Sequence, residues 1–115
     1  MQEGGIKFYH RTFSSDAILR EGFKDAEGYF LTASLHKGVW GSDIPLDANQ
    51  GAEGDIVLCI ELPEKVIADY EWIEEGKPHR EFLAPAKLLN KYGPPKIVER
   101  DAPKHPLLRK MLKQT

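Results

Sequence analysis

Histidine and threonine lie two residues apart at the end of the segment Phe8-Tyr9-His10-Arg11-Thr12. The aromatic, β-prone run from Ile6 to Tyr9 predicts a strand, so His10 and Thr12 would lie at its carboxyl end. A polar pair at a strand end that faces the start of a helix is suited to hold an anion such as phosphate. The alternative is a surface strand in which His10 only satisfies a neighbouring group.

A short helix is predicted directly after this segment. Ser14, Ser15 or Asp16 could accept backbone N–H bonds at its start. Ala17 to Leu19 continue the helix, and Gly22 ends it, because glycine adopts the left-handed conformation at little cost.

Aromatic residues follow in a second cluster. The stretch Gly28–Ser34 contains Tyr29 and Phe30 and predicts a strand that ends in small hydroxyl residues, including Ser34. Trp40 comes next, between two nearby glycines, which indicates a ring presented from a flexible backbone. Burial of the ring as part of the core is the other interpretation, and the sequence leaves both open.

Glu81 is the candidate acid. It lies in His79–Ala84, which predicts a strand, and side chains of neighbouring strand residues point to opposite faces. Glu81 should therefore share its face with His79 and not with Arg80, which we interpret as an exposed or paired structural cation. Glu81 is either a functional carboxylate or a solvated charge on the strand.

The composition indicates a single domain over residues 1–115, with 41% hydrophobic and 30% charged residues. A formal net charge of −2 gives no general attraction to nucleic acid or anionic membrane. Cys59 is the one cysteine, which excludes an intramolecular disulfide and a multi-cysteine zinc site, and a buried, inert thiol is expected. Without a long apolar run or a signal-peptide pattern, we expect a soluble cytoplasmic protein that does not enter membranes.

The loop at 42–54 is rich in Asp, Asn, Gly and Pro. Its acids Asp43, Asp47 and Glu53 do not have the spacing of an EF-hand loop, so no metal is expected. A structured loop of this length in a small domain indicates that it borders a site.

The remaining pattern predicts an α+β fold of mainly antiparallel strands, arranged as two small packed sheets with short helices. The other predicted elements are a loop at Phe23–Glu27, a turn or short helix at Leu35–Lys37, strands at Asp55–Leu62, Val66–Ile73 and Lys96–Arg100, a helix after Pro85, and an amphipathic helix at Pro106–Lys113.

Three parts of the pattern, from about Phe8 to Asn90, resemble the ADP-ribosyltransferase superfamily. The first is a histidine at the end of the first strand with a threonine two residues on, as in His10 and Thr12. The second is Gly28-Tyr29-Phe30 with Ser34 and Trp40, although the spacing after Gly28 is one residue shorter than the family pattern. The third is a glutamate on a later strand, as in Glu81-Phe82-Leu83-Ala84-Pro85.

The resemblance implies that NAD is the substrate and that ADP-ribose passes to an acceptor with release of nicotinamide, without a metal. Glu81 would stabilise the positive charge that develops on the ribose, and His10 would hydrogen-bond the adenosine ribose. Tyr29 or Trp40 would stack on nicotinamide, and a phosphate could meet Arg11, Arg20 or the helix start. The implied NAD-binding residues are His10, Arg11, Thr12, Tyr29, Phe30, Ser34 and Trp40, and the implied catalytic residues are Glu81 and His10.

The sequence does not identify the acceptor of ADP-ribose, which is a protein, a nucleic acid, a small molecule or water. Two alternatives to ADP-ribosyltransferase activity also remain open. His79 stands where arginine-modifying members of the family have Glu or Gln, which disfavours arginine as the acceptor. RNA 2′-phosphotransferases share the fold and a His-x-Thr opening, but they are larger and more basic. The other alternative is a non-catalytic module that binds a nucleotide or a protein.

Overall fold

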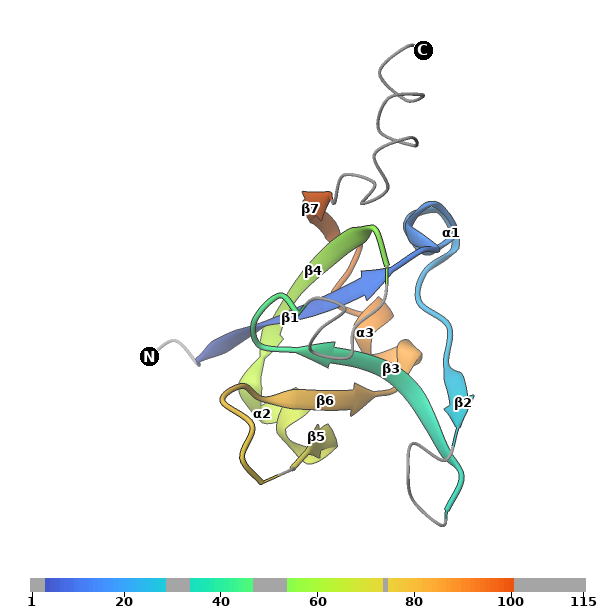
Figure 1. The fold of residues 1–115 in the computed structure, drawn as a ribbon. Coiled ribbons are helices and arrows are strands. Elements are labelled where there is room, and N and C mark those ends of the chain that lie inside the picture. The colour runs from blue at the N-terminus through green and yellow to red at the C-terminus, as the bar shows by residue number, and fades with distance from the viewer. Residues whose placement is uncertain (1–3, 29–33, 47–53, 74, 101–115) are drawn as a thin grey trace, which may run out of the picture.

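The strands of this chain form one antiparallel sheet around β1 (Figure 1). The computed structural model describes residues 4–28, 34–46, 54–73 and 75–100. Within them, seven strands form one sheet in the order β5-β6-β3-β1-β4-β7, and β2 pairs with β3. The strands are β1 (Gly5–Thr12), β2 (Ala26–Gly28), β3 (His36–Ser42), β4 (Ile56–Pro63), β5 (Glu71–Trp72), β6 (Glu81–Ala84) and β7 (Lys96–Arg100).

In the described part of the chain, four short helical segments connect the strands: α1 (Ser15–Glu21), α2 (Glu64–Ile67), the 3-10 helix η2 (Ala68–Tyr70) and α3 (Ala86–Asn90). The α+β class with mainly antiparallel strands is confirmed. The two packed sheets are a wrong prediction, because β1 pairs with both β3 and β4 and so joins all described strands into one sheet. Among the described residues, no helix is long and apolar enough to cross a bilayer.

The core lies on one face of the sheet. Phe8 of β1 and Phe82 of β6 are fully buried there, with ring centroids 6.4 Å apart. Ile67 at the end of α2 and Leu89 in α3 are also fully buried in this cluster, so both helices pack on the same face. Burial of such large apolar side chains is the main source of stability for a domain of this size.

Gly41 allows the closest contact in this core. A Cβ atom added to Gly41 would lie 2.1 Å from Cζ of Phe8, so only glycine leaves space for the ring. The glycine beside Trp40 therefore serves the packing of Phe8, and it does not make the backbone around Trp40 flexible.

Several predicted elements are confirmed, with bounds that shift by one or two residues. The helix after Ser14 ends at Gly22, which has a φ of 90°. Strands are found at Ile56–Pro63, Glu81–Ala84 and Lys96–Arg100, and Pro85 immediately precedes α3. The predicted helix at 106–113 and most of the predicted strand at 28–34 lie outside the described residues.

Three other predictions of local structure are wrong in whole or in part. Most of Val66–Ile73 is helical, because Pro63 ends β4 and the following turn buries Ile67 in the core; only β5 remains a strand. The loop predicted at Phe23–Glu27 is found over residues 23–25, but β2 begins at Ala26; the turn predicted at Leu35–Lys37 gives way to β3 from His36. β2 and β3 pair with each other, and this cross-strand pairing overrides weak local preference.

Candidate functional site

A row of side chains crosses the sheet on the face opposite the core. Tyr9 pairs with Ser42, Ser42 pairs with Glu81, and Glu81 pairs with Trp72. Residues directly opposite each other in antiparallel strands project to the same face. Tyr9, Ser42, Glu81 and Trp72 are therefore neighbours on this face, whereas Phe82, next in sequence to Glu81, is in the core.

Glu81 is held by two cationic or polar partners. His79 Nε2 lies 3.0 Å from Glu81 Oε1, and Lys77 Nζ lies 3.2 Å from the same oxygen. Only 15% of the Glu81 side chain is exposed, so it is not a solvated strand charge. The predicted proximity of Glu81 and His79 is confirmed. Arg80 instead pairs with Glu64 and Glu71, as expected of a structural cation.

His79 has an unusual environment for a buried histidine. Its side chain is 5% exposed, and its Nδ1 atom is buried without a hydrogen-bond partner among the described residues. A carboxylate only accepts hydrogen bonds, so the proton lies on Nε2, and in neutral His79 the Nδ1 atom carries a lone pair. Buried polar atoms without partners are rare in folded proteins, so His79 Nδ1 is an unusual feature of this region.

A pocket of about 240 Å³ opens at this pair. It is lined by Glu71, Trp72, Ile73, Lys77, Pro78, His79, Arg80 and Glu81. Its lining therefore brings together the Glu81 carboxylate, the His79 imidazole and the Trp72 indole.

Three aromatic rings pack edge to face beside Glu81. The Trp40 and Trp72 ring centroids lie 5.1 Å apart at 70°, and the His36 and Trp72 centroids lie 5.0 Å apart at 83°. Trp40 is half-buried in this cluster and lies on the face opposite the core. It is therefore neither a freely exposed ring nor part of the core, the two interpretations that the sequence left open. An aromatic surface of this kind can receive a flat ligand ring.

His10 lies where β1 and β3 separate. A single register pair, Tyr9 opposite Ser42, joins these two strands, and His10 Nδ1 lies 2.6 Å from the backbone oxygen of Trp40. Because a carbonyl only accepts, Nδ1 carries a proton. Burial lowers the pKa of His10 below its ordinary value of 6.5, so the ring is neutral near pH 7 and its Nε2 atom is an acceptor.

The structure does not bring the His10 ring to the Glu81 carboxylate. Alternation along β1 directs His10 to the side of Phe8 and toward Phe23, whose ring centroid is 5.6 Å away, whereas Glu81 shares the face of Tyr9. Trp40 connects the two, through its carbonyl to His10 and through its ring to the Glu81 face.

The other predicted site residues have different surroundings. The Arg11 side chain is 4% exposed and donates to the backbone oxygens of Leu46 at 2.5 Å and Gly54 at 3.2 Å and to Glu99 at 2.6 Å, so its guanidinium is already occupied. Thr12 Oγ1 accepts the Ser14 N–H at 2.8 Å and so shapes the turn before α1. Ser34 is exposed, and Tyr29 and Phe30 lie outside the described residues.

Sequence reasoning missed Trp72, His36 and Lys77 as members of the site. Trp72 carried a signal, since it lies in a stretch predicted as a strand, but its position opposite Glu81 depends on the pairing of β5 with β6. Within the described ranges, His, Cys, Asp and Glu side chains form no group of three suited to hold a metal ion. Comparisons with family models, curated proteins and solved structures give no match to this chain.

Proposed function

We propose that this protein binds NAD at the Glu81 face of the sheet and transfers its ADP-ribose to an acceptor, with release of nicotinamide. The observation that carries the proposal is the buried Glu81–His79 pair beside the Trp40–Trp72 rings. An acid that is fixed in place next to an aromatic surface meets the two needs of this reaction, stabilisation of a cationic ribose and a seat for a flat ring.

The reaction breaks the bond between the ribose C1′ atom and the nicotinamide nitrogen. The electron pair of that bond leaves with nicotinamide, and the ribose acquires oxocarbenium character. The Glu81 carboxylate accepts a hydrogen bond from a ribose hydroxyl and stabilises the positive charge, an effect that is strong where water is excluded. The acceptor then bonds to C1′, and the Glu81 carboxylate receives the acceptor's proton.

His10 serves this site as a positioning residue from the opposite face of the sheet. Its protonated Nδ1 donates to the carbonyl of Trp40 and so fixes the backbone that carries the Trp40 ring. Lys77 and Arg80, rather than Arg11, are the cations that line the pocket. Arg80 is paired with Glu64 and Glu71, so Lys77 is the one proposed to approach the diphosphate. This assignment keeps His10, Trp40 and Glu81 in the site but gives the phosphate contact to a different residue.

Calorimetric titration with NAD, followed by measurement of released nicotinamide, tests the proposal. The chain should bind NAD and release nicotinamide, and Glu81→Gln should keep binding while losing about 10²-fold or more in release rate. Glu61→Gln, which removes an exposed acid from β4, is the matched control and should leave the rate unchanged. No heat with NAD would refute the proposal.

Two other outcomes identify the alternatives. Binding without release of nicotinamide would mean a non-catalytic nucleotide-binding module. Activity on 2′-phosphorylated RNA, lost in Glu81→Gln, would mean that the same face serves phosphate transfer from RNA.

A further inference from the structure

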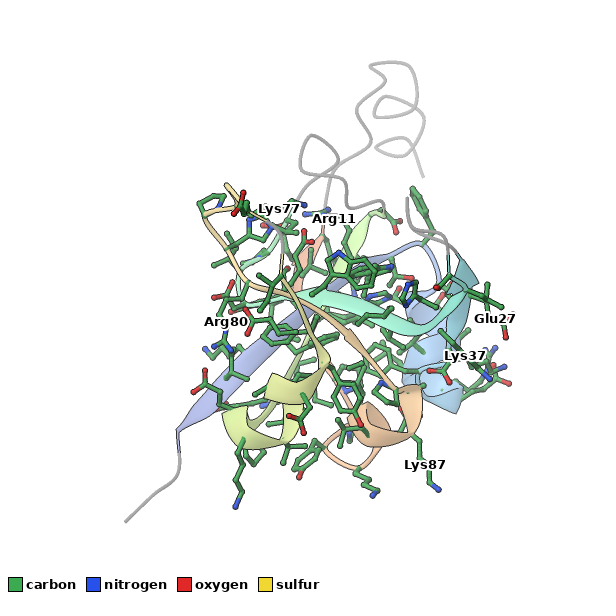
Figure 2. The ribbon with its side chains drawn as sticks, turned by 90° about the horizontal axis from the view of Figure 1, so that it is seen from below. Arg11, Glu27, Lys37, Lys77, Arg80 and Lys87 are labelled. Carbon is green, nitrogen blue, oxygen red and sulfur yellow. The ribbon has the colours of Figure 1, made fainter. Side chains whose placement is uncertain are left out.

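A second concavity lies away from the Glu81 face. It has a volume of about 660 Å³ and is lined by Phe23, Lys24, Asp25, Lys37, Ala86, Lys87, Asn90 and Lys91. Lys37 follows His36 on β3, and alternation directs it to the face opposite that of Trp40 and Trp72. In Figure 2, Lys37 and Lys87 lie at one edge of the molecule and Arg80, which borders the Glu81 pocket, lies at the opposite edge.

Hydrogen bonds between its walls hold this concavity in shape. The side chain of Asn90 in α3 accepts the N–H of Phe23 at 2.8 Å and donates to its carbonyl oxygen at 3.0 Å. Asp25 accepts the N–H of Ala86 at 2.8 Å, at the start of the same helix. The segment before β2 is thus fixed to both ends of α3, and the lysines extend from a prearranged frame.

The charge of the lining is strongly positive. Lys24, Lys37, Lys87 and Lys91 are all exposed, and Asp25 is the one acid among the lining residues, which leaves a formal charge of +3. Glu21 is 4.0 Å from Lys24, and Glu27 is opposite Lys37 in the strand register. In the described part of the chain, Lys37, Lys87 and Lys91 form no ion pair with an acid.

We propose that this lysine concavity, defined by Lys24, Lys37, Lys87 and Lys91, binds the phosphate backbone of a single-stranded nucleic acid. The concavity is wide and open to solvent, so it would bury little of a small anion, but a chain of phosphates can reach several lysines at once. The lining holds lysines and no arginine, and lysine binds phosphate as a point charge without a fixed bidentate geometry. The proposal does not depend on NAD chemistry.

Fluorescence anisotropy with a labelled single-stranded RNA of about 12 nucleotides tests this site. Four phosphate contacts predict a slope of about −2.8 in a plot of log K against log salt, so binding should weaken about 50-fold between 50 and 200 mM salt. The triple variant Lys37→Gln/Lys87→Gln/Lys91→Gln keeps one contact, and the same change of salt should weaken its binding only about threefold. Lys7→Gln/Lys65→Gln/Lys96→Gln removes the same charge from exposed positions elsewhere and should keep the steep slope.

Three outcomes would overturn the proposal. The first is no binding of the RNA at 50 mM salt by a parent protein that melts normally. The second is an equal loss of slope in both triple variants, which would show a general charge effect and no defined site. The third is displacement of the RNA by poly-glutamate at equal charge, which would mean that an acidic protein is the partner.

Discussion

Substitution of Gly41 by alanine should destabilise the fold at the point where core and candidate site meet. The new Cβ atom would lie 2.1 Å from Cζ of Phe8, and ordinary contact begins at 3.4 Å, so the ring must withdraw by about 1.3 Å. Phe8 is fully buried and packs against Phe82, with ring centroids 6.4 Å apart, so the ring must move within a packed core. Overpacking of this kind costs about 1–3 kcal/mol.

Part of this cost is offset because alanine loses less backbone entropy than glycine on folding. The offset is about 0.5–1 kcal/mol, so the free energy of unfolding should fall by about 0.5–2 kcal/mol. Urea unfolding followed by tryptophan fluorescence measures this change. Gly5→Ala on β1 is the control, since its Cβ atom would meet the flexible end of Glu61 at 3.3 Å. It should keep the entropic gain without the clash, so its free energy of unfolding should not fall.

A double-mutant cycle identifies the cause. Phe8→Leu makes room for the new methyl group. The double variant Phe8→Leu/Gly41→Ala should therefore lose less free energy of unfolding than the two single variants together, by about 0.5–1 kcal/mol or more. Strict additivity, or a Gly41→Ala protein as stable as the parent, would refute the packing argument.

Three further predictions follow from individual contacts. Burial lowers the pKa of His10 below 6.5, so the stability that depends on a neutral His10 is complete above that pH and is lost as the pH falls through the folded-state pKa. The melting temperature should therefore decline on acidification, and less steeply in His10→Gln. Arg80→Ala should lower the free energy of unfolding by about 1–2 kcal/mol in urea, since it removes two partly exposed ion pairs and a contact 5.2 Å above the Phe82 ring, whereas Arg100→Ala should have almost no effect. Burial raises the pKa of the Cys59 thiol, so iodoacetamide should modify it more slowly than free cysteine at pH 8, and an equal rate would contradict this environment.

Local patterns in the sequence were sufficient to predict the strands that carry His10 and Glu81. Strand alternation alone correctly placed His79 beside Glu81 and sent Arg80 to other partners. Composition and capping patterns correctly predicted the end of α1 at Gly22. These features depend on residues that are close together in the chain, where the periodicity of the backbone decides the outcome.

Features that depend on register could not be obtained in this way. The expectation that His10 and Glu81 face one cleft required the pairing of β1 with β3 and of β3 with β6, and the observed register sends the two side chains to different faces. The surroundings of Arg11 likewise depend on Leu46, Gly54 and Glu99, which are 35 to 88 residues away in sequence. Only the folded sheet determines such contacts.

The sparse pairing between β1 and β3 has a mechanical consequence. It divides the sheet into one half with β3, β6 and β5 and another with β1, β4 and β7. β1 and β4 pair over eight register positions, whereas a single register pair joins β1 and β3 at the seam between the halves. Amide protons along the seam should exchange with solvent sooner than those between β1 and β4. A molecule that contacts both His10 of β1 and Trp40 of β3 would bridge the two halves of the sheet, so that they would unfold together.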